Sequence, residues 1–217
     1  MTPITQWAGR ICMVVAATLI VSSELLRLII GLVLGPDSAT TLWHTLTYGL
    51  ALGSMYTLLL AVTALYAAHQ QALGVLGLVG YLTASIGTVL VAGDWWFEAF
   101  AVPTIGMQAP EILTLPPAGS VFAGAMITVS LFVTGWITFG VAMFRSGAFT
   151  RTAAVLVVIG GGCSVLALST PYQIPLAVAI GWVGYTLMRG RQHRLPATGT
   201  ERPASTVTGR LPAQHPR

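Results

Sequence analysis

Long apolar stretches are the feature that most constrains the fold of this chain. Residues 7–34 form the first, and at 1.5 Å per residue they can cross about 30 Å of hydrocarbon. Five more stretches follow, giving six predicted helices at residues 7–34, 41–68, 73–102, 118–144, 152–168 and 172–188. The sequence therefore predicts an all-α fold, a polytopic transmembrane helical bundle of six spans.

The scarcity of charge supports this class. Only 7% of the 217 residues are charged, against about 25% in an ordinary soluble domain. The net charge of +4 comes from arginine, because the chain has no lysine, and the arginines flank apolar segments. We therefore expect a lipid bilayer as the main partner and no nucleic acid. The lack of both lysine and asparagine fits the codon usage of a GC-rich bacterium.

The arginines also predict an orientation. Arg10 lies at the start of the first predicted helix, Arg145 and Arg151 lie between the fourth and fifth, and the six arginines from Arg189 onwards follow the sixth. With six spans all of these fall on one side, which the positive-inside rule makes cytoplasmic. We expect both termini in the cytoplasm, a multi-pass protein of the bacterial cytoplasmic membrane, and a disordered Arg-, Pro- and Thr-rich tail over residues 189–217.

The third predicted helix contains a stripe of small residues that ends in two acids. Gly80, Ala84 and Gly87 recur at helical spacing, and the same line continues through Asp94 and Glu98. Small residues let helix backbones approach closely. The sequence therefore predicts that both carboxylates point into protein. The helix is expected to stop at Pro103, with a short helix in residues 110–113 after it.

Ionisable and aromatic residues gather in the first three predicted helices. The expected intramembrane polar cluster comprises Glu24, Arg27, His44, Tyr48, Asp94 and Glu98. Matching their depths along each helix pairs Arg27 with Asp94 and His44 with Glu98. Three tryptophans, Trp43, Trp95 and Trp96, are expected to form an interfacial aromatic belt.

Three interpretations of this cluster remain open. The favoured one is structural: a buried polar network that fixes how the first three helices dock. The second is a proton- or cation-linked transporter, because three carboxylates face one permanent cation, Arg27. The third is a membrane-embedded metal-dependent hydrolase using His44, Asp94 and Glu98, although one histidine with two acids is a poor zinc signature. No cofactor is expected, an enzyme is less favoured, and assembly into a homo-oligomer or larger membrane complex stays open.

One resemblance rests on these residues. The run Gly-Asp-Trp-Trp-Phe-Glu-Ala-Phe-Ala-Val-Pro at 93–103, closing the third predicted helix, resembles small uncharacterised six-span integral membrane proteins of GC-rich bacteria. The resemblance implies six spans and assigns no activity and no functional residue.

Overall fold

The protein is helical throughout the part that the structure, a computed structural model, describes: residues 3–116, 119–166 and 173–189. Helix α1 (Pro3–Leu34) leads through a 3-10 turn, η1 (Gly35–Thr40), into α2 (Leu42–Trp96). The remaining elements are η2 (Phe97–Ala101), α3 (Val102–Gln108), α4 (Pro110–Leu113), α5 (Gly119–Ser146), α6 (Arg151–Cys163), η3 (Ser164–Leu166) and α7 (Ile174–Arg189). The prediction of an all-α fold is confirmed for these residues, which contain no strand.

Helix α2 is two antiparallel arms joined by a tight reversal. The backbone leaves helical geometry at His69 (φ −128°, ψ 15°) and at Gly74 (φ 60°, ψ −157°). A positive φ of this kind is costly for residues with a Cβ, so glycine suits the turn. The arms, residues 42–68 and 75–96, pack on each other. The rings of Tyr66 and Tyr81 stack with centroids 4.6 Å apart.

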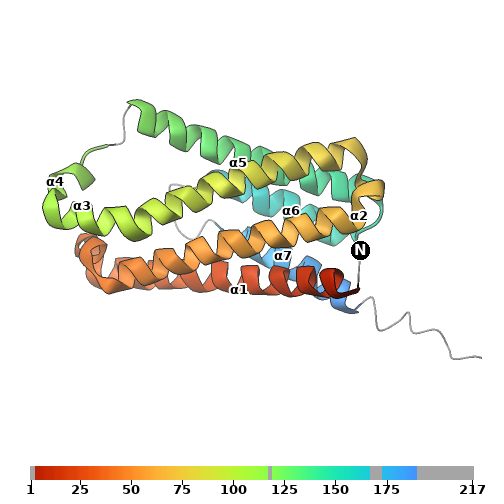
Figure 1. Cartoon of the computed structure of the whole chain (residues 1–217), viewed down its shortest axis with the longest axis horizontal. Coiled ribbons are helices and arrows are strands. Elements are labelled where there is room, and N and C mark those ends of the chain that lie inside the picture. The colour runs from red at the N-terminus through yellow and green to blue at the C-terminus, as the bar shows by residue number, and fades with distance from the viewer. Residues whose placement is uncertain (1–2, 117–118, 167–172, 190–217) are drawn as a thin grey trace, which may run out of the picture.

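The six long segments form a closed ring of antiparallel neighbours. Helix α1 packs on the first arm of α2, the second arm packs on α5, α5 on α6, α6 on α7, and α7 returns to α1. Figure 1 shows these segments running roughly parallel to the long axis of the molecule. The start of α1 and the end of α7 lie at the same end of the bundle. We call this the arginine end, since Arg145 and Arg151 flank the α5–α6 connection there.

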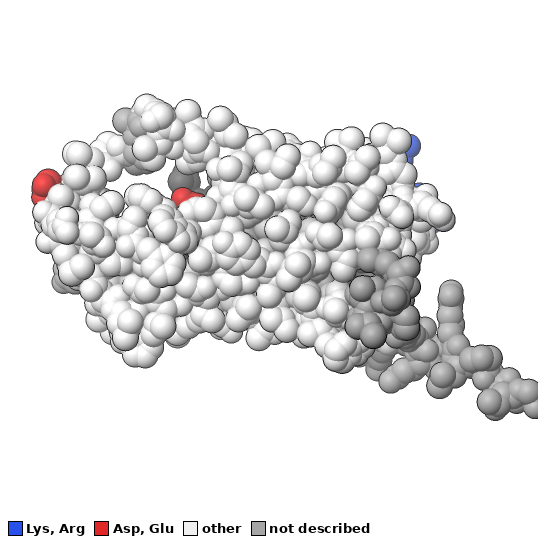
Figure 2. All heavy atoms as spheres, in the orientation of Figure 1, with Lys and Arg blue, Asp and Glu red and all other residues white. Residues whose placement is uncertain are grey.

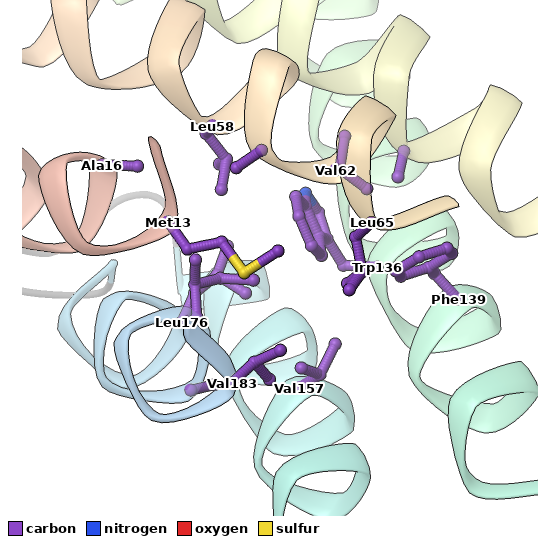
Figure 3. Packing of buried hydrophobic residues seen from close by; sticks show 14 of the residues in the cluster. Met13, Ala16, Leu58, Val62, Leu65, Trp136, Phe139, Val157, Leu176 and Val183 are labelled. Atoms are coloured by element: carbon purple, nitrogen blue, oxygen red, sulfur yellow. The ribbon is translucent and has the colours of Figure 1, made fainter. Parts of the chain in front are cut away.

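The centre of the ring is an apolar core. Trp136 of α5 is fully buried and lies among side chains from α1, α2 and α7, including Met13, Leu58 and Leu176 (Figure 3). Its ring packs against the flanking Phe139, with centroids 6.3 Å apart. Burying large side chains of this kind is the main source of packing stability in a close-packed interior.

The predicted small-residue stripe lies at the contact between α2 and α5. A Cβ built on Gly80 would lie 2.6 Å from the main-chain nitrogen of Phe139, and one on Gly87 would overlap the main chain of Phe132. The two backbones therefore touch directly, as GxxxG-type packing allows.

Beyond that contact the two helices separate. The first half of α5 is exposed along residues 119–127, and Figure 1 shows it leaning away from α2 and α3. The surface is hollowed between these segments, with acidic atoms at the edge of the hollow (Figure 2). We call this opening, bounded by residues 93–101 and 119–127, the wedge.

The helix predicted to end at Pro103 continues. Its chain passes through a π-helical turn, η2, and resumes as α3, in which Pro103 occupies the first turn. A proline is tolerated there because first-turn N–H groups have no partner within the helix. The helix predicted in residues 110–113 is present as α4.

Three helices are long and apolar enough to cross a membrane: Trp7–Leu34, the continuous stretch Leu42–Gln108, and Gly119–Ser146. Two further apolar helices, Arg151–Cys163 and Ile174–Met188, are shorter. The predicted tail beyond residue 189 lies outside the described residues.

Candidate functional site: a polar cluster joining α1 to both arms of α2

An ion pair within α1 forms the first part of the cluster. Arg27 Nη2 lies 3.2 Å from Glu24 Oε2, at i,i+3 spacing on one face of the helix. The Glu24 side chain is only 2% exposed and that of Arg27 is 14% exposed. A carboxylate this deeply buried needs its partner, because an unpaired buried charge is strongly destabilising.

The guanidinium of Arg27 also contacts two aromatic rings, one from each arm of α2. Its Cζ lies 5.8 Å from the centroid of the Tyr48 ring and 5.1 Å from that of the Trp95 ring. Both distances fall within the range of cation–π attraction. The two rings are themselves 5.6 Å apart. Arg27 therefore connects three helical segments through one side chain.

His44 continues the cluster toward η2. Its Nε2 lies 3.0 Å from the main-chain oxygen of Glu98 and 3.6 Å from Glu98 Oε2. Its ring also packs on Tyr48, with centroids 4.4 Å apart. The predicted proximity of His44 and Glu98 is thus present. The contact falls inside the π-helical turn, and such turns occur frequently at functional sites.

Asp94 differs from its prediction. Its side chain is exposed, although the stripe to which it belongs is buried as far as Val91. Helices that cross at an angle touch only near the crossing point. Since α5 has already diverged, the wedge lies opposite Asp94. The acids are not both covered by protein: the Asp94 side chain is exposed, while Glu98 is partly covered.

The predicted pairing of Arg27 with Asp94 is replaced by a nearer partner. Arg27 pairs with Glu24 on its own helix, and Asp94 feels the charges of Arg27 and Glu98 only at longer range. Within the part of the chain that the structure describes, the Asp94 carboxylate makes no hydrogen bond and no ion pair within 4 Å. It is the carboxylate of the cluster that remains open to a ligand.

The three tryptophans separate into two groups. Trp43 and Trp96 are 59% and 53% exposed, as expected for a belt, but Trp95 is 4% exposed and belongs to the cluster. Sequence analysis also missed Thr47, which is 1% exposed. Its position three residues after His44, on the same helical face, was the available signal. Thr47 Oγ1 and Trp95 Nε1 have no hydrogen-bond partner among the described residues.

Gln173, at the start of α7, is a further buried polar residue near this level. Helix α7 packs on α1 through Gly181 opposite Ala17. Continuing this antiparallel register by about two turns brings Gln173 level with Glu24. The cluster therefore occupies one layer of the bundle, and α6 ends and α7 begins close to that layer.

The metal site suggested for His44, Asp94 and Glu98 does not form in this arrangement. Among the residues described, no three His, Cys, Asp or Glu side chains come close enough together to hold a metal ion. Cys12 and Cys163 are free thiols on separate helices. The arrangement offers paired charges, aromatic rings and one open carboxylate.

Comparison with protein-family models, with curated proteins and with solved structures found no match to this chain. The resemblance of residues 93–103 to small bacterial membrane proteins remains a prediction. The geometry of the cluster is therefore the basis for a functional proposal.

Proposed function

We propose that this chain is a six-span integral membrane protein of the bacterial cytoplasmic membrane, with both termini in the cytoplasm. The exposed side chains of the long helices support the proposal, because many are large and apolar, among them Ile29, Leu60, Val79, Ile86 and Ile127. A surface of this kind is typical of lipid contact. Charge is segregated as well. In the view of Figure 2, blue basic atoms lie at the arginine end and red acidic atoms at the opposite end and in the hollow.

The positive-inside rule then makes the arginine end cytoplasmic. From the Gly74 turn, Asp94 lies about 30 Å along the second arm of α2, which is one hydrocarbon thickness. The polar cluster thus occupies the outer part of the membrane, and the wedge opens near the outer interface. This placement is tested with reporter fusions. Alkaline phosphatase, and separately GFP, is fused after residue 189 and within residues 104–109. A phosphatase-active fusion after residue 189 would contradict the placement.

Within that frame, we propose that the cluster docks α1 onto both arms of α2. The observation that supports this most is the position of Arg27, which pairs with Glu24 while its guanidinium covers Tyr48 and Trp95. In lipid the hydrophobic effect does not drive helices together, so polar and packing contacts decide their arrangement. The cluster supplies such contacts at the end of the bundle where α5 leaves α2.

Docking is tested by comparing Trp95→Leu with Trp96→Leu. Trp95 contacts Arg27, whereas the neighbouring Trp96 is exposed and faces away from the cluster. The account predicts that only Trp95→Leu lowers the unfolding midpoint of the purified protein in detergent. Equal losses would mean that Arg27 does not hold the helices through this ring.

A second function is favoured by Asp94. We propose that its carboxylate binds a proton or a small cation that enters from the wedge, as in a proton- or cation-linked transporter. Glu24 is paired with Arg27, and Glu98 is engaged by His44, which leaves Asp94 as the acid available to a ligand. Ionisable residues at membrane depth commonly mark ion or substrate pathways.

This second function is tested in liposomes. Protein reconstituted with an internal pH-sensitive dye should dissipate an imposed proton or sodium gradient, and Asp94→Asn should abolish that flux. Glu111→Gln is the matched control, because Glu111 is an exposed acid of α4 outside the cluster. No flux above that of empty liposomes, or equal loss in both variants, would contradict the transport role and leave the docking role intact.

A further inference from the structure

A small pocket opens at the arginine end, on the opposite side of the membrane from the polar cluster. It lies between α1, the first arm of α2 and α7, and its volume is ≈ 90 Å³. A space of this size is large enough to hold a small polar group. Its lining residues are Gly9, Arg10, Met13, Ala64, Leu65, Ala68, His69 and Leu187.

The polar atoms of this pocket suit an anion. Arg10 places a permanent positive charge in its wall, and His69 supplies a ring whose Nδ1 lies 3.1 Å from the main-chain oxygen of Leu65. Because a carbonyl oxygen only accepts, Nδ1–H donates there. This contact holds the His69 ring in the pocket wall. Phe149 packs on the same ring, with centroids 4.7 Å apart, and fixes its orientation.

Charge around the pocket is favourable to the same ligand. Every acidic residue that the structure describes lies in the other half of the bundle, on the far part of α1 or beyond the middle of α2. Arg145 and Arg151 lie at the same end as the pocket. Guanidinium and phosphate form strong charge-assisted hydrogen bonds.

The rest of the lining identifies the source of that anion. Met13, Leu65 and Leu187 give the pocket an apolar wall, which a free phosphate ion would not use but the first carbons of a lipid would. Trp7, one turn before Arg10 on α1, is 61% exposed, as interfacial tryptophans are. Basic pockets between helices at the cytoplasmic interface are suited to anionic lipid headgroups.

We propose that this pocket binds the phosphate of an anionic phospholipid from the cytoplasmic leaflet, with Arg10 as the charged contact and His69 as part of the pocket wall. The inference rests on the proposed membrane placement, which the fusion experiment tests separately. Gly9 supports the shape of the site, because any Cβ there would overlap that of Ala64 and separate α1 from α2 beneath the pocket.

The test uses protein purified in a maltoside detergent and the short-chain lipid dihexanoyl-phosphatidylglycerol as the probe. Its affinity is read from the rise in thermal-unfolding midpoint with lipid concentration. We expect tighter binding than for dihexanoyl-phosphatidylcholine, and about a tenfold loss of affinity in Arg10→Gln. Arg145→Gln is the control, because it removes a charge from the same end outside the pocket.

Ala68→Leu keeps both polar groups but fills the pocket, so it should also abolish the preference for phosphatidylglycerol, even if Arg10→Gln does not fold. Three results would overturn the proposal. These are equal affinity for the two lipids, an equal loss in Arg145→Gln, and unchanged binding in Ala68→Leu. If inorganic phosphate stabilises the protein as strongly as the lipid does, the ligand of the pocket is a free anion and not a lipid headgroup.

Discussion

The Cζ atom of Arg27 lies 5.1 Å from the centre of the Trp95 ring, so a cation on α1 rests on an aromatic residue 68 positions later in the chain. Glu24 balances the charge of that cation one helical turn away. This arrangement lets a buried arginine tie α1 to the second arm of α2.

The cation–π contact between Arg27 and Trp95 should add to the stability that the buried apolar area of Trp95 provides. Replacing Trp95 by Phe keeps an aromatic face, whereas replacing it by Leu removes it. We expect Trp95→Leu to cost roughly 0.5–2 kcal/mol more unfolding free energy than Trp95→Phe. Chemical denaturation in mixed micelles measures the difference. The same comparison in an Arg27→Met background should show no difference, and a persisting difference would assign the effect to packing alone.

His44 should hold the π-helical turn in place. His44→Phe keeps the ring stacking on Tyr48 but removes the donor to the Glu98 main-chain oxygen. We expect a loss of about 1–3 kcal/mol, because a part-buried acceptor is left without its partner. Faster amide hydrogen exchange in residues 97–101 would locate the effect. Unchanged exchange there would show that the turn does not depend on His44.

The close approach of α2 to α5 can be tested by comparing Gly80, which lies at the contact, with Gly93, which does not. A Cβ at Gly80 would press on the main chain of Phe139, whereas nothing lies within 4 Å of one at Gly93. Gly80→Ala should cost about 1–3 kcal/mol through overpacking. Gly93→Ala should be neutral or gain roughly 0.5–1 kcal/mol from helix propensity. Thermal unfolding of both variants tests this expectation. Equal changes in the two unfolding midpoints would contradict the backbone contact.

The sequence was sufficient to predict the helices and their periodicity. The small-residue stripe predicted a close helix contact, and the contact exists at Gly80 and Gly87. His44 and Glu98 were matched by depth alone and do approach each other. The small-residue stripe and the depth of each polar residue depend only on positions along each helix, and these can be counted directly in the sequence.

Features that depend on how two helices cross could not be predicted in this way. Asp94 continues the stripe but is exposed, because the part of α5 before Phe132 diverges from α2. Trp95 was grouped with Trp96 as interfacial, yet a rotation of about 100° between neighbours places only Trp95 in the cluster. The π-helical turn before Pro103 is a local change of register that periodicity alone does not reveal.

The central claim is that the Glu24–Arg27 pair holds together the end of the bundle opposite the arginine end. A cycle of Glu24→Gln, Arg27→Met and the double variant, measured as unfolding free energy in detergent, tests it most directly. Each single change should cost about 3–5 kcal/mol by leaving one buried charge unpaired, and the double change should recover most of that loss. Additive losses, with the double variant as unstable as the two single changes combined, would contradict the claim.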